Sequence, residues 1–243
     1  MRQGAHRVLS LSSFAVLVDK ELRSLFLLPI AWALIGVFLF LMGYSFTLTL
    51  FSTSSATLVH IFFQAAGLLL LLIPIITMRS FAEERKSGTL ELLLTSPVSE
   101  GVLVLAKFVA SLAVVVVMIA ATGAYAGVLA WFSTPDWGVI YSGYLGLVLL
   151  GATLVAIGLM FSAMTSNQVV AAILAIGVSF LMWTLDSLAQ LLPTGLERIF
   201  ISLSLLARFT PFATGAMYAS DFGFFITVTA LALFIAVRSL ARR

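Results

Sequence analysis

Long apolar runs, separated by short polar segments, follow one another along the whole chain. A helix that crosses a bilayer needs roughly 20 consecutive, mostly apolar residues. Six runs meet this requirement, at 25–49, 58–78, 102–131, 139–164, 169–191 and 222–237. The pattern therefore predicts an all-α integral membrane protein with six transmembrane helices. No remaining segment is long or polar enough for a separate domain, so we expect residues 1–243 to form one.

The composition agrees with a membrane protein. The chain is 62% hydrophobic and 9% charged, with a mean hydropathy of +1.17. Soluble domains carry about 25% charged residues, so lipid must cover much of this surface. The first apolar run is too long for a signal peptide, and we expect it to be retained. The absence of cysteine excludes thiolate ligands, and His6 and His60 are too few for a multi-histidine metal site.

Basic residues predict the orientation, because cytoplasmic loops of membrane proteins are enriched in Lys and Arg. With the N-terminus inside, eleven basic residues face the cytoplasm and only Arg198 and Arg208 face outward. This bias predicts that both termini are cytoplasmic. The eleven are Arg2, Arg7, Lys20, Arg23, Arg79, Arg85, Lys86, Lys107, Arg238, Arg242 and Arg243.

Segment 1–24 has the pattern of an amphipathic helix before the first span. An elbow helix on the inner membrane surface is one interpretation, and a frayed polar start of span one is the alternative. Its polar positions include Lys20, Glu21 and Arg23, and Arg23 follows Asp19 at i, i+4 spacing. The apolar face comprises Leu11, Phe14, Ala15, Val18, Leu22 and Leu25.

The extracytoplasmic segment 192–221 also has an apolar face. Pro193 and Gly195 precede it, and Pro211 and Gly215 follow it. We expect a short interfacial or re-entrant helix before the last span, with a plain loop at headgroup depth as the alternative. The apolar face comprises Leu196, Ile199, Phe200, Leu203 and Leu206.

Ionisable residues are missing where an ion-coupled carrier would need them. No Asp, Glu, Lys or Arg lies within 24–78, 137–185 or 222–237. Asp186 falls near the outer end of span five, and we expect Lys107 to extend to the inner interface. Ion coupling is disfavoured, although sodium sites built from carbonyls and hydroxyls stay open. Because the chain has neither a phosphate-binding loop nor a catalytic motif, we expect a non-catalytic subunit powered by a partner.

The cytoplasmic segment 79–100 contains four of the ten acidic residues. We expect span two to continue as a helix to Ser87 and Gly88 to end it with a positive φ. Thr89 can then cap a short leucine-rich helix that Pro97 helps to end, and Ser99 can start span three. This layout favours a rigid docking lever. The alternative is a charged loop that merely follows the positive-inside rule.

The run 83–99, E-E-R-K-S-G-T-L-E-L-L-L-T-S-P-V-S, followed by Lys107-Phe108, resembles type-2 ABC-transporter permeases. It is most similar to their gliding-motility subgroup. Segments 20–29, 136–146 and 165–168 fit the same pattern, and Gly215 and Asp221 match more weakly. The resemblance covers nearly the whole chain.

The resemblance implies a complex in the bacterial inner membrane: two permeases, identical or paralogous, on a cytoplasmic ATPase dimer that binds ATP and Mg. No cofactor is expected in this chain, and nucleic acid is not an expected partner. It further implies that segment 79–100 holds the coupling helix, that the turn 165–168 makes a second contact, and that residues 20–23 belong to the elbow. The implied coupling residues are Glu83, Glu84, Arg85, Gly88, Thr89, Glu91, Leu92, Thr95 and Pro97, and those of the second contact are Ser166, Asn167 and Gln168.

The resulting hypothesis is an ATP-driven exporter of a lipid, polysaccharide or peptide. A mechanotransmitting subunit of an envelope or motility machine, with a large extracytoplasmic partner, is the alternative. A membrane enzyme or secondary carrier is disfavoured. Gly151, Ala152, Ala156 and Gly158 could let spans pack closely.

Overall fold

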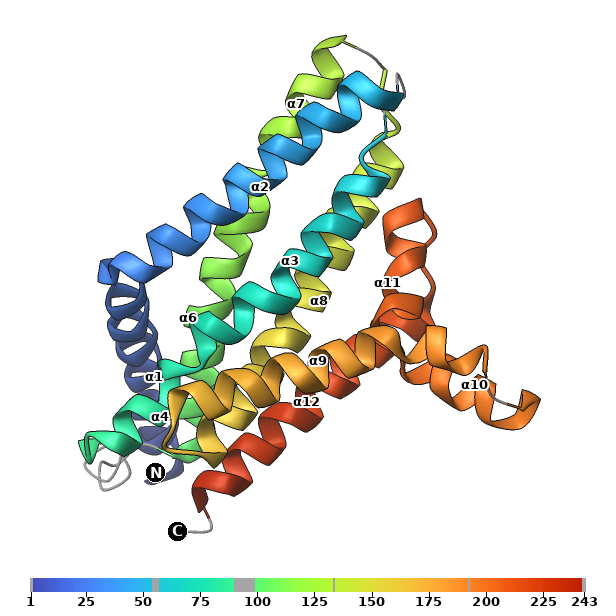
Figure 1. Cartoon of the computed structure of the whole chain (residues 1–243). Coiled ribbons are helices and arrows are strands. Elements are labelled where there is room, and N and C mark those ends of the chain that lie inside the picture. Colours follow the sequence, from blue (N-terminus) through green and yellow to red (C-terminus); the bar gives the residue numbers. More distant parts are fainter. Residues whose placement is uncertain (1, 54–56, 90–98, 133, 192, 242–243) are drawn as a thin grey trace.

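Helices make up nearly all of the computed structural model, which describes residues 2–53, 57–89, 99–132, 134–191 and 193–241 (Figure 1). No strand occurs in these ranges, which confirms the all-α prediction. The helices are α1 (Arg2–Leu27), α2 (Pro29–Thr53), α3 (Val59–Thr77), α4 (Arg79–Lys86), α6 (Glu100–Ala121), α7 (Gly123–Phe132), α8 (Trp137–Met164), α9 (Gln168–Ala189), α10 (Thr194–Leu203), α11 (Leu205–Thr214) and α12 (Ala219–Ala241).

Six spans are found among the described residues, as the hydropathy pattern predicts. They are Pro29–Phe51, Val59–Lys86, Glu100–Phe132, Trp137–Met164, Gln168–Ala189 and Ala219–Ala241, each long and apolar enough to cross a membrane. The first span starts later than expected. Proline fits the first position of a helix, and α2 starts at Pro29 after a break at Leu28.

Both termini lie at one end of the helical bundle (Figure 1), which an even number of spans requires. We call this the terminal end. The start of α6, the helix α4 and the turn between α8 and α9 lie at the same end, and α7 lies at the opposite end. The N-terminal helix α1 is separate from α2 and packs along α6.

The helix α8 is the centre of the fold, because it packs against α3, α6, α9, α11 and α12. Small residues allow this close approach. A Cβ added at Gly158 would lie 2.0 Å from the Thr77 hydroxyl oxygen of α3, and one at Gly143 would lie 2.2 Å from the Phe62 ring. The predicted role of Gly158 in close packing is therefore confirmed, and Gly143 has the same role.

Segment 193–221, which the sequence predicts to be extracytoplasmic, forms two helices instead of the one expected. Ser204 is extended and separates α10 from α11, and its hydroxyl accepts a hydrogen bond from the Ala207 amide in the first turn of α11. Pro211 lies inside α11 rather than after it, and Gly215 ends that helix with a φ of +93°. The helix α10 packs against α9, whereas α11 packs against both α8 and α9 and has Phe209 and Phe212 fully buried.

Candidate coupling site

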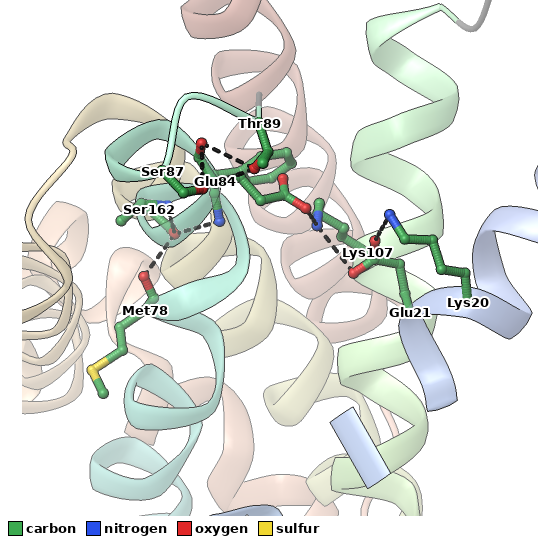
Figure 2. A network of polar contacts seen from close by, with 10 residues as sticks. Lys20, Glu21, Met78, Glu84, Ser87, Thr89, Lys107 and Ser162 are labelled. Atoms are coloured by element: carbon green, nitrogen blue, oxygen red, sulfur yellow. Dashed lines mark hydrogen bonds and ion pairs between the residues drawn. The ribbon is translucent and has the colours of Figure 1, made fainter. Parts of the chain in front are cut away.

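A buried lysine joins three helices at the terminal end. Lys107 lies about two turns from the start of α6, and its side chain is 2% exposed. Its ammonium donates to Glu21 of α1 at 3.0 Å and to Glu84 of α4 at 2.7 Å (Figure 2). The expected extension of Lys107 to the inner interface stays a prediction, but its ammonium ends on protein carboxylates and not in solvent. Two carboxylates within hydrogen-bonding distance hold the ammonium in the protein interior.

An aromatic ring and a second lysine lie next to the Lys107 ion pairs. The Phe81 ring centre is 5.3 Å from the ammonium, and Lys20 approaches Glu21 from the exposed side at 3.8 Å. One Glu84 oxygen, Oε2, is buried with no hydrogen-bond partner among the described residues. Removing one partner of a buried ion pair leaves an uncompensated charge. Moving α1 or α4 away from α6 would do this, so the ion pairs of Lys107 hold the three helices together.

A single serine fastens α4 to the central helix. The Ser162 hydroxyl of α8 accepts hydrogen bonds from the amides of Phe81 and Ala82, at 3.0 and 3.1 Å, and donates to the Met78 carbonyl at 2.9 Å (Figure 2). The first amides of a helix have no partners within it, so Ser162 supplies what the start of α4 lacks. The α3–α4 junction is thereby held against α8.

Side-chain contacts also fix the geometry of α4 from its first residue to its last. Arg79 and Glu83 form a two-pronged ion pair at i, i+4 spacing, with contacts of 2.7 and 2.9 Å. As predicted, α4 ends with Ser87 at its C-cap, and Gly88 follows with a φ of +74°. The Thr89 hydroxyl donates back to the Glu84 carbonyl at 3.3 Å. Residues 87–89 are therefore held in place by α4.

The predicted coupling residues fall into three groups. Glu83 and Glu84 pair within the protein, and Arg85 is half-buried. Gly88 and Thr89 are exposed at the end of α4. The remainder, Glu91, Leu92, Thr95 and Pro97, lie outside the described residues, so their role and the expected coupling helix stay predictions.

The turn predicted as a second contact lies at the terminal end as well, where α4 contacts α9. The Asn167 side chain accepts hydrogen bonds from the Val169 and Val170 amides and caps α9. Ser166 and Asn167 are exposed, and Gln168 starts the helix. Thus α4 and this turn offer neighbouring surfaces at one end of the molecule.

Sequence reasoning missed how Glu21, Lys107 and Ser162 come together. The sequence counts Glu21 among the polar positions of the elbow, and the structure places it on the buried side of α1 with Leu22 and Leu25. A signal existed in the sequence, because Lys107 is the only basic residue between Lys86 and Arg198. An isolated charge inside an apolar span requires a partner.

Fold and site together define a multi-pass α-helical membrane protein with a fastened helical extension at its terminal end. The family model described as ABC-2 family transporter protein matches residues 15–237. The chain belongs to this family, and it is a permease component of an ABC transporter. Membership implies association with an ABC ATPase subunit. Comparison with curated proteins yields no match.

Proposed function

We propose that this chain is the membrane subunit of an ATP-driven exporter, most similar to the gliding-motility subgroup of permeases. A separate cytoplasmic ATPase dimer binds ATP and Mg, hydrolyses the nucleotide and moves the permease helices. The substrate leaves the cytoplasm or the inner leaflet. A second permease, identical or paralogous, completes the membrane part.

The observation that carries the proposal is the contact of Lys107 with both Glu21 and Glu84. A force applied at the end of α4 reaches α6 through Glu84 and α1 through Lys107. It reaches the central helix α8 through Ser162. A loosely attached loop would absorb such a displacement, whereas a fastened one passes it to the spans. Only contacts that differ between the two states can shift their populations, so a stiff attachment favours coupling.

The terminal end would be the cytoplasmic end, in a bacterial inner membrane. The charge bias supports this orientation, because the basic residues of α1, α4 and the end of α12 all lie at that end. Exposed tryptophans mark the opposite interface at Trp131 and Trp137. The ATPase would then contact segment 79–100 first and the turn 165–168 second.

Cysteine cross-linking tests the partner and the side together, because the native chain has no cysteine. Ser87→Cys places a thiol at the exposed end of α4, and Thr134→Cys places a matched exposed thiol at the opposite end. We expect Ser87→Cys to cross-link to the ATPase and to resist a membrane-impermeant thiol reagent in intact cells. Thr134→Cys should behave in the opposite way. Labelling of Ser87→Cys from outside would overturn the proposed orientation.

Reconstitution with the ATPase distinguishes export from force transmission. An exporter should show substrate-stimulated ATP hydrolysis and ATP-dependent movement of the substrate between compartments. ATP hydrolysis that responds to neither lipid, polysaccharide nor peptide, but to a large extracytoplasmic subunit, would favour the mechanotransmitting alternative. The same preparation with Asp19→Asn serves as the control, because the one ion pair of Asp19 within the described part of the chain is with Arg23, on the exposed side of α1.

A further inference from the structure

A cavity of about 350 Å³ lies where α10, α11 and the start of α12 meet, away from both termini (Figure 1). Its charged lining residues are Arg198 of α10, Arg208 of α11 and Asp221 of α12. Tyr218 also lines it, and both Arg198 and Tyr218 are exposed, so a molecule outside the protein can enter the cavity. The cavity is therefore an accessible polar site, separate from the cluster around Lys107.

The charges that line the cavity leave a positive excess. Asp221 neutralises Arg208, because its Oδ1 accepts a hydrogen bond from the guanidinium at 2.8 Å. The other Asp221 oxygen, Oδ2, is fully buried, so a ligand would not touch it. The Arg198 side chain has neither an ion pair nor a hydrogen bond within the described residues, and its neighbour Glu197 does not line the cavity. One positive charge is therefore left without a counterion in this part of the chain.

Arg208 is held in a fixed position and still has free donors. Its Nε donates to the Ser202 carbonyl at 3.2 Å, its Nη1 donates to Asp221, and the guanidinium carbon is 5.6 Å from the centre of the Phe224 ring. A guanidinium has five N–H donors in a rigid fork. The Nη2 group has no partner among the described residues, and the side chain is 25% exposed. Arg208 is therefore a preorganised donor that a ligand can reach.

The distribution of basic residues along the chain indicates a role for this cavity. Eleven of the thirteen Lys and Arg follow the positive-inside rule, and Arg198 and Arg208 are the two exceptions. Both exceptions meet at one cavity, although they belong to different helices. The ion pair with Asp221 accounts for Arg208. It does not account for Arg198, whereas a role in binding an anion accounts for both arginines.

We propose that this cavity binds a phosphate group, with Arg198 and Arg208 donating to its oxygens and the Tyr218 hydroxyl as a third donor. A phosphate ester has more acceptor oxygens than a carboxylate, so it can accept from three side chains at once. The volume of about 350 Å³ is within the range of small-molecule sites, about 300–1,000 Å³. It leaves room for the small group that is esterified to the phosphate. A lipid headgroup and a soluble phosphate ester share this chemistry.

The test uses the purified full chain, without ATPase, in an uncharged detergent, and measures bound ligand by native mass spectrometry. One arm compares phosphatidic acid with diacylglycerol of the same acyl chains, and the other compares glycerol 3-phosphate with glycerol. Each pair differs only in the phosphate. Because hydrogen bonds to charged groups are strong, we expect a preference of roughly tenfold or more for the phosphate ester in at least one arm. No preference in either arm would overturn the proposal.

Variants of Arg198 locate the site, and the fold should tolerate them because this side chain is exposed and has no partner within the described residues. Arg198→Gln should abolish the preference for the phosphate ester. Arg198→Lys, which keeps the charge and loses the planar fork, should retain only part of it. Arg23→Gln removes the same charge from the exposed side of α1 and should preserve the preference. If Arg198→Gln keeps the preference, or Arg23→Gln lowers it as much, the proposal fails.

Competition between the two esters distinguishes the sources of the phosphate. Glycerol 3-phosphate that displaces phosphatidic acid at equal concentration supports the site with a soluble ester as its ligand. Phosphatidic acid that is retained under the same conditions supports the site with a lipid headgroup as its ligand. Because no ATPase is present, failure of the phosphate site leaves the proposed export function untouched, and a loss of coupling in the reconstituted complex leaves the phosphate site untouched.

Discussion

Replacing Lys107 with methionine should damage the terminal end more than any other single change to a charged residue there. Methionine keeps the length of the aliphatic part of lysine and removes only the ammonium. That ammonium is the donor to Glu21 at 3.0 Å and to Glu84 at 2.7 Å. Without it, two carboxylates, 12% and 19% exposed, face each other in a poorly solvated site.

The expected loss of stability in Lys107→Met follows from the two carboxylates that stay without a cationic partner. Removing one partner of a buried ion pair destabilises a protein by about 3–5 kcal/mol, because the other charge stays buried and uncompensated. Glu21 and Glu84 retain some solvent contact, so we expect the lower half of that range, about 3 kcal/mol. The cost should fall mainly on the attachment of α1 and α4 to α6, because α8 keeps its own hydrogen bonds to α4 through Ser162.

Two measurements follow from Lys107→Met. The apparent melting temperature of the purified protein should fall clearly below that of the native chain. In the reconstituted complex, ATP hydrolysis should persist while substrate movement declines. Adding Glu21→Gln and Glu84→Gln removes the stranded charges, so the triple variant should regain most of the stability but not the coupling. Asp19→Asn should match the native chain in both assays.

The reasoning fails if Lys107→Met melts at the native temperature, because the ammonium would then contribute nothing to holding the helices together. It also fails if the triple variant couples as well as the native chain. In that case the neutral contacts would suffice, and the ion cluster would have no part in transmitting movement.

Three further changes test the packing, the second ion pair and the loop. Gly158→Val should destabilise the chain by about 1–3 kcal/mol or more, because the added side chain forces α3 and α8 apart. The folded yield in a gel-filtration assay should fall. Gly177→Ala is the control and should be harmless, because no atom lies within 4 Å of the added Cβ. Arg208→Met leaves the Asp221 carboxylate, which is 4% exposed, without its cationic partner, so the melting temperature should fall. Adding Asp221→Asn should restore the melting temperature. A double variant that melts as low as Arg208→Met would contradict the pairing. In Gly88→Ala, the alanine must adopt a φ of +74°, which should destabilise the end of α4 by about 1–2 kcal/mol. Proteolysis at the end of α4 should therefore be faster than in the native chain. An unchanged proteolysis rate would refute the argument.

The spans were predictable because hydropathy alone decides them, but their ends were not. Leu25 continues the apolar run of the first span, yet it belongs to α1. The helix is interrupted at Leu28, and α2 begins at Pro29. A run of apolar residues cannot show such a break, since both sides of it are equally hydrophobic. Local polar signals performed better. Ser99 caps α6 with a contact of 3.4 Å to the Val102 amide, and Gly88 ends α4, both as predicted.

The site was only partly predictable, because its central contacts join residues far apart in the chain. Glu21 and Lys107 are separated by 86 positions, and Ser162 contacts Phe81 across 81 positions. Nothing in the spacing of these residues indicates which helices will be neighbours. The sequence could show only that an isolated Lys107 inside an apolar span needs an acidic partner, and Glu21 and Glu84 both met that condition.

Two clusters of buried ion pairs, found among the described residues, have the same arrangement at opposite ends of the bundle. Lys107 fastens α1 and α4, and Arg208 of α11 pairs with Asp221 of α12 at 2.8 Å. Each cluster joins a helix outside the six-span core to a spanning helix, while apolar contacts and close-packed glycines hold the middle. Since the clusters share no residue, the losses of stability in Lys107→Met and Arg208→Met should add within about 0.5 kcal/mol. A cost well beyond that sum would mean that the spans transmit strain between the two ends even without ATP.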